Sequence, residues 1–95
     1  MEIGNKRLIS REHILKQLQV LLEPWLQDTE GSEQIQEGVN LLTDLGLDSV
    51  AILQLVLGIE KEFDVTIKDH ELDSKVFSKM ANLIDIIVGK LNETD

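Results

Sequence analysis

The sequence predicts an all-α fold of four helices, three long and one short, with a long loop between the first two. The main observation is that apolar residues recur at helical spacing in three stretches, 11–23, 49–63 and 79–91. Val65 and Ile67 alternate as in a strand, but one short strand would have nothing to pair with, so we expect an extended link there. A chain of 95 residues, 42% of them hydrophobic, is sized for one globular domain.

The composition narrows the possible functions. The formal net charge of −9 argues against nucleic acid as a partner, because its phosphates would be repelled. The absence of cysteine excludes disulfides, thiolate metal sites and a cysteine nucleophile. No apolar run approaches the roughly 18 residues of a membrane helix, and the N-terminus has no signal-peptide core, so we expect a cytoplasmic protein without membrane insertion. We expect a single domain over 1–95, with flexible ends at 1–9 and 92–95.

The first helix is predicted over 11–23. Ser10 is a favoured N-cap residue, and Ile9 and Ile14 occupy the positions of a hydrophobic staple around it. Pro24 is expected to end the helix, because an interior proline removes a hydrogen bond and clashes with the preceding turn.

Residues 27–47 form a long connection, and loops of this length in a small domain are usually functional or disordered. We expect a mobile tip near Gly31, where the sequence is polar and turn-forming. The second half should lie across the helices, held by its apolar side chains: Ile35, Val39, Leu41, Leu42, Leu45 and Leu47.

The second helix is predicted to begin at Ser49, with Asp48 as its N-cap. In this register Leu47 and Ile52 occupy the two positions of a hydrophobic staple. If Ser49 were the cap instead, Asp48 and Leu53 would take those positions, and an aspartate cannot make the apolar contact. The favoured register leaves the Ser49 hydroxyl free to face solvent, where the helix dipole would favour an attached anion.

Two apolar faces are predicted on the helix over 49–63. The core face consists of Ile52, Leu55, Val56, Ile59 and Phe63. Val50 and Leu57 lie one above the other roughly opposite this face, with Leu53 on the shoulder. Isolated exposed apolar side chains are normal, but aligned ones beside Ser49 favour a surface on which a partner docks.

The last third of the chain is predicted to contain a short helix over 69–76, with Leu72 and Val76 facing inward, and a final helix over 79–91. Ser78 is the expected N-cap of the final helix. The acidic side chains that end the second helix oppose its dipole, which indicates either another use or simple solubility.

Signals for catalysis and for metal binding are missing. His13 and His70 fall on different predicted helices and have no paired ligand spacing, so we expect no metal site. Ser49 lacks the flanking glycines of a nucleophile elbow, and the sequence contains no glycine-rich phosphate-binding loop. We therefore expect a protein that is not an enzyme by itself.

The sequence Asp-Leu-Gly-Leu-Asp-Ser at 44–49 closely resembles the phosphopantetheine attachment motif of acyl carrier proteins. The resemblance covers roughly 41–91, and the helix order long, long, short, long is also similar to the acyl carrier bundle. It implies that Ser49 carries a phosphopantetheine arm, whose thiol holds an acyl or aminoacyl group as a thioester. It implies that Asp48 helps a phosphopantetheinyl transferase recognise the site, and that the carrier is a monomer serving acyl-loading and acyl-accepting enzymes.

Departures from the family pattern leave the pathway open. Fatty-acid carriers have several acids along the start and middle of this helix, whereas Ala51 and Gln54 stand here, and Lys61 interrupts the acidic cluster. Fatty-acid, other lipid and specialised biosynthetic pathways are all compatible with these residues. The expected docking surface consists of Val50, Leu53, Gln54, Leu57, Glu60 and Lys61. The alternative function is an unmodified acidic helical module that binds a partner through the same helix.

Overall fold

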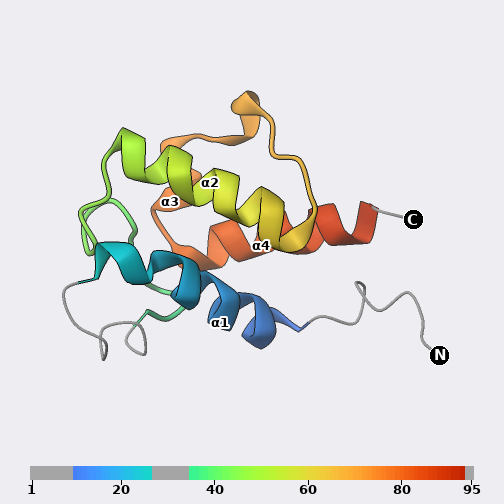
Figure 1. Cartoon of the computed structure of the whole chain (residues 1–95), viewed down its shortest axis with the longest axis horizontal. Coiled ribbons are helices and arrows are strands. Elements are labelled where there is room, and N and C mark those ends of the chain that lie inside the picture. Colours follow the sequence, from blue (N-terminus) through green and yellow to red (C-terminus); the bar gives the residue numbers. More distant parts are fainter. Residues whose placement is uncertain (1–9, 27–34, 94–95) are drawn as a thin grey trace.

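The computed structural model describes residues 10–26 and 35–93. All regular elements in these ranges are helical (Figure 1). They are α1 (Arg11–Leu22), the 3₁₀ turn η2 (Glu23–Trp25), α2 (Ser49–Phe63), the 3₁₀ turn η4 (Asp69–Glu71), α3 (Ser74–Phe77) and α4 (Met80–Glu93). Helix α1 packs against both α2 and α4, and the short α3 packs against α4. No strand occurs in the two described ranges, and the predicted all-α class with three long helices and one short helix is confirmed.

Most of the interior is built from aliphatic side chains of the three long helices and of the loop that precedes α2. Its largest fully buried members are Ile14, Leu18, Leu22, Ile35, Leu41, Leu55, Ile59, Met80, Leu83, Ile84 and Ile87. The burial of Ile35, Leu41 and Leu47 confirms that apolar side chains anchor this loop to the helices. The predicted tip near Gly31 lies outside the described residues.

Helix α1 begins and ends close to the predicted positions. The side-chain oxygen of Ser10 accepts a hydrogen bond from the His13 amide at 3.1 Å, which confirms the cap. Ile9, one half of the proposed staple, lies outside the described residues. The α-helix ends at Leu22, and Pro24 lies at the start of the turn η2, where a missing amide is tolerated.

The prediction of one continuous short helix over 69–76 is wrong. The chain forms η4, breaks at Leu72 and starts again as α3 after Asp73. The Asp73 carboxylate accepts hydrogen bonds from the amides of Lys75 and Val76, at 3.0 and 3.2 Å. This N-cap is the physical reason for the break, because a capping residue has an extended backbone that a helix running through it could not have.

The prediction that Ser78 caps the last helix is also wrong. The Ser78 hydroxyl donates a hydrogen bond to the Lys75 carbonyl at 2.8 Å, so Ser78 closes α3. The first amide of α4, that of Met80, donates instead to the Val39 carbonyl at 2.8 Å. A carbonyl of the distant loop therefore replaces the expected local cap. Helix α4 extends to Glu93, two residues beyond the predicted end at residue 91.

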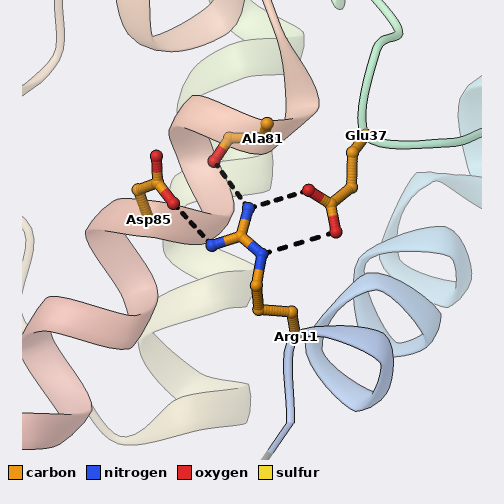
Figure 2. A network of polar contacts seen from close by, with 4 residues as sticks. All are labelled: Arg11, Glu37, Ala81 and Asp85. Atoms are coloured by element: carbon orange, nitrogen blue, oxygen red, sulfur yellow. Dashed lines mark hydrogen bonds and ion pairs between the residues drawn. The ribbon is translucent and has the colours of Figure 1, made fainter.

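Arg11 joins α1 to the loop and to α4, as Figure 2 shows. Its guanidinium donates to the Glu37 carboxylate from Nε at 3.4 Å and from Nη2 at 2.8 Å. It also donates to the Asp85 carboxylate and, at 3.5 Å, to the Ala81 carbonyl. The hydrogen bonds to Glu37 and then Asp85 raise the pKa of Arg11 above its ordinary value. This network fixes the loop that leads toward α2.

Candidate functional site

Asp48 and Ser49 form the start of α2. The Asp48 backbone is extended, and its Oδ1 accepts a hydrogen bond from the Ala51 amide at 2.8 Å. Asp48 is therefore the N-cap, as the staple register predicted. Ser49 is the first helical residue and is exposed. Its hydroxyl is not needed to cap the helix.

The first backbone amides of α2 point to an anion site. The Ile52 amide donates to the Asp48 carbonyl at 2.9 Å, and the Asp48 side chain holds the Ala51 amide. The amides of Ser49 and Val50 have no protein partner in the part of the chain that the structure describes. Unpaired amides at the positive end of a helix of 15 residues favour a negative group there, such as a phosphate ester on Ser49.

The loop that enters α2 is held in shape by its own side chains. The side-chain oxygen of Asn40 accepts hydrogen bonds from the Leu42 and Thr43 amides at 2.8 and 3.0 Å. The Asp44 carboxylate accepts one from the Asn40 amide at 2.9 Å. Gly46 has a φ of 70°, although a Cβ there would meet nothing within 4 Å. Gly46 therefore serves the left-handed turn and not a close contact.

An open and largely apolar cavity of about 450 Å³ lies beside Ser49, and we call it the Ser49 cavity. Its lining residues are Leu42, Leu47, Asp48, Ser49, Ile52, Leu53, Leu72, Asp73, Ser74 and Phe77. One wall thus comes from the segment between η4 and α3, which the fold brings from far along the chain. This wall was not predicted from the sequence, because no local pattern indicates that the segment lies against the start of α2.

A second cavity of about 300 Å³ lies at the same helix start, and we call it the Trp25 cavity. It is lined by Trp25, Leu45, Gly46, Leu47, Asp48, Val50, Ala51 and Gln54. Leu47 and Asp48 line both cavities, so the start of α2 stands between them.

The exposed face of α2 carries the predicted apolar side chains. Val50, Leu53 and Leu57 are 62%, 57% and 53% exposed. Exposed apolar side chains that share one helix face are typical of interaction surfaces, so the docking prediction keeps its basis. The core face differs from the prediction at its first turn, where Ala51 is buried and Ile52 is half-buried.

The polar members of the predicted docking surface fall into two groups. Gln54 and Lys61 are exposed on α2. Glu60 is half-buried, and its carboxylate accepts a hydrogen bond from the Ile67 amide at 2.8 Å. Glu60 therefore holds the extended link that follows α2, in which Val65 and Ile67 are buried.

Glu71 and Lys90 form an ion pair that was not predicted from the sequence. Glu71 Oε2 lies 2.8 Å from Lys90 Nζ, and Glu71 Oε1 accepts a hydrogen bond from the Lys68 amide at 2.8 Å. The hydrogen bond from Lys90, and then the one from Lys68, lower the pKa of Glu71. No sequence signal reveals this pair, because its members lie far apart on different elements.

Residues 10–26 and 35–93 contain neither a candidate metal site nor a candidate membrane-spanning helix. His13 is near Gln17, with its Nε2 3.5 Å from the Gln17 amide nitrogen, and His70 is exposed in η4. These ranges contain no cluster of three histidine, cysteine or acidic side chains that could hold a metal ion. They also contain no helix long and apolar enough to cross a membrane.

Comparison with known proteins identifies the family. The family model for the phosphopantetheine attachment site matches residues 19–84. The chain is 31% identical to an acyl carrier protein of Cyanidium caldarium over 85 residues, which cover 90% of this chain and 94% of the relative. It is also 31% identical to an acyl carrier protein of Thermotoga maritima over 84 residues, covering 88% and 99%. The chain therefore belongs to the phosphopantetheine attachment site family, as a non-catalytic carrier protein related to the acyl carrier proteins.

Proposed function

We propose that Ser49 carries the phosphopantetheine arm and that the protein delivers an acyl or aminoacyl group on this arm between enzymes. The observation that carries this proposal is the exposed Ser49 hydroxyl at the start of α2, beside two amides without a described protein partner. The hydroxyl would form the phosphodiester bond, and the amides and helix dipole would stabilise its phosphate. The residues present therefore fit the group.

Asp48 has two proposed roles. Its Oδ1 caps α2 through the Ala51 amide, which fixes the backbone that presents Ser49. Its position next to the attachment residue also supports a role in recognition by the phosphopantetheinyl transferase. Loss of this side chain would then affect both the helix start and the modification.

The arm supplies a thiol, which this cysteine-free chain cannot provide, and the thiol would hold the cargo as a thioester. The Ser49 cavity lies beside the attachment point and is largely apolar, so it would shelter the apolar part of the cargo from water. Tethering raises the effective concentration of the cargo at an enzyme that has docked the carrier.

Docking of the enzymes that load and accept the cargo is proposed on the exposed face of α2. Val50, Leu53 and Leu57 would be the apolar anchors, with Gln54 and Lys61 beside them. Glu60 belongs to this surface only in part, because its carboxylate already accepts a hydrogen bond from the Ile67 amide. Few acids stand at the start of this face, which supports a dedicated pathway at least as well as general fatty-acid synthesis.

The cellular setting is part of the same proposal. We propose a cytoplasmic, monomeric carrier that forms a single domain over 1–95. The formal net charge of −9 supports a protein that repels its own copies and disfavours nucleic acid.

The test is intact mass after expression with a phosphopantetheinyl transferase and coenzyme A. The wild-type mass should rise by one prosthetic group, and Ser49→Ala should show no increase. An unchanged wild-type mass would favour the alternative, an unmodified acidic helical module that binds through the exposed face of α2. A rise that persists in Ser49→Ala would place the arm on another residue.

A further inference from the structure

The Glu71–Lys90 ion pair differs from the other ion pairs in the described ranges. The side chains of Glu71 and Lys90 are 24% and 15% exposed, whereas Arg11 and its partners Glu37 and Asp85 are 41–63% exposed. Glu71 uses both carboxylate oxygens, one for Lys90 and one for the Lys68 amide. A single side chain thus ties the turn η4 to Lys68, the residue that precedes it, and to α4.

The Glu71–Lys90 ion pair lies next to one wall of the Ser49 cavity. Glu71 is the last residue of η4, and the next three residues, Leu72, Asp73 and Ser74, line the Ser49 cavity. Among the polar contacts of the described residues, η4 has its own 3₁₀ hydrogen bonds and the two contacts of the Glu71 carboxylate. The preceding hydrogen bond to a helix side chain is the one that the Ile67 amide donates to the Glu60 carboxylate. The wall of the cavity therefore begins directly after the point where Glu71 is fixed.

We infer that Glu71 and Lys90 are positioning residues, which hold the wall formed by Leu72, Asp73 and Ser74 against the start of α2. They thereby set how well a cargo on Ser49 is shielded from water. This inference rests on the proposed function, because the shielded group is the thioester-linked cargo. Partly exposed ion pairs add little to global stability, so the value of this pair lies in fixing the geometry of one segment.

The chain offers matched variants for the test. Lys90→Met removes the cation and keeps a long side chain, while Lys90→Arg keeps the charge. Arg11→Met breaks the ion pairs of Arg11, and none of the residues in those pairs lines the Ser49 cavity. This variant therefore shows how far a general loss of stability would change the measurements.

The first measurement uses the unloaded protein. Amide hydrogen exchange over residues 69–74 should be faster in Lys90→Met than in wild type by roughly 1.5-fold to fivefold, the range expected for a partly exposed ion pair. Lys90→Arg should restore the wild-type rate, and Arg11→Met should leave this segment unchanged. Unchanged exchange over 69–74 in Lys90→Met would overturn the inference.

The second measurement uses protein loaded with an acyl thioester. Hydroxylamine should cleave the thioester faster in Lys90→Met than in wild type, again by roughly 1.5-fold to fivefold, with rescue by Lys90→Arg. Equal rates in Lys90→Met and wild type, or an equal increase in Arg11→Met, would overturn the shielding role. Failure of the wild type to load at all would instead refute the proposed function, so the two failures are distinguishable.

Discussion

Two Asp–Ser pairs begin two helices of this protein, and both pairs line the Ser49 cavity. In each pair the aspartate has an extended backbone and caps the helix. The Asp48 carboxylate accepts a hydrogen bond from the Ala51 amide, and the Asp73 carboxylate accepts hydrogen bonds from two amides of α3. Ser49 and Ser74 are both exposed as first helical residues. The local chemistry of the two pairs is nearly the same.

The helices behind the two pairs are different. Helix α2 has 15 residues and α3 has 4, so only α2 carries a substantial dipole toward its first residue. Ser49 is followed along α2 by exposed apolar side chains, whereas Ser74 is followed by the exposed Lys75 and then by buried Val76. We therefore expect that an Asp–Ser pair alone does not make an attachment site. The helix and surface around it must supply the anion environment and the docking face.

The largest expected effect separates the two serines. Ser74→Ala should accept the phosphopantetheine arm as wild type does, and Ser49→Ala should accept none, even though Ser74 is still present. Intact mass after treatment with the transferase measures both variants. Modification at Ser74 in the Ser49→Ala protein would show that the pair itself is sufficient.

The next effect concerns the caps. Asp48→Ala should lower the free energy of unfolding by roughly 0.5–2 kcal/mol, because the Ala51 amide loses its acceptor. Ser49→Ala should cost clearly less than about 1 kcal/mol, since its hydroxyl is not the cap. Urea denaturation of both variants measures the difference. A larger loss in Ser49→Ala than in Asp48→Ala would reverse the assignment of the cap.

Leu57→Ala should weaken binding of the true partner by more than about 1 kcal/mol, as for a contributing interface anchor. Val20→Ala is the matched control, because Val20 is also exposed, at 56%, but lies on α1. Affinity titrations across a salt series give the comparison. If Leu57→Ala is silent while Glu62→Gln abolishes binding, docking is electrostatic and the case for a dedicated pathway loses its main support.

Glu60→Ala should destabilise the protein by about 1 kcal/mol, because the Ile67 amide loses its acceptor. Glu60→Gln keeps a side-chain oxygen and should change stability less. Thermal or urea unfolding separates the two. Equal losses would mean that the charge of Glu60, and not its hydrogen bond, holds the link after α2.

The smallest effect is on acid stability. The folded-state pKa of Glu71 is below its ordinary value, so its contribution is present above that value and is lost as the pH falls through the folded pKa. Wild type should therefore lose more stability than Lys90→Met between about pH 5 and pH 3. Unfolding free energies at several pH values measure this. Parallel curves for the two proteins would show that Lys90 does not act on Glu71.

The sequence was sufficient where the deciding residues are neighbours. The Asp48 cap followed from residues 47–53, and the exposed side chains of α2 followed from its helical period. It was not sufficient where the partner is distant. The start of α4 is satisfied by a loop carbonyl and not by Ser78, and the Glu71–Lys90 pair leaves no local pattern.

The prediction over 69–76 failed for a different reason. The periodicity of Leu72 and Val76 suits a helix, but Asp73 between them has a stronger preference for capping. The competing signal was therefore present in the sequence, and the break it causes creates one wall of the Ser49 cavity.

The Trp25 cavity gives the unlabelled protein an optical probe at its most informative place. Trp25 is the only tryptophan, the chain has no tyrosine, and the half-buried indole shares its cavity with Asp48, next to Ser49. Indole emission shifts with the polarity of its surroundings. The indole fluorescence of this protein therefore originates from one site, and no dye is needed to follow events at the start of α2.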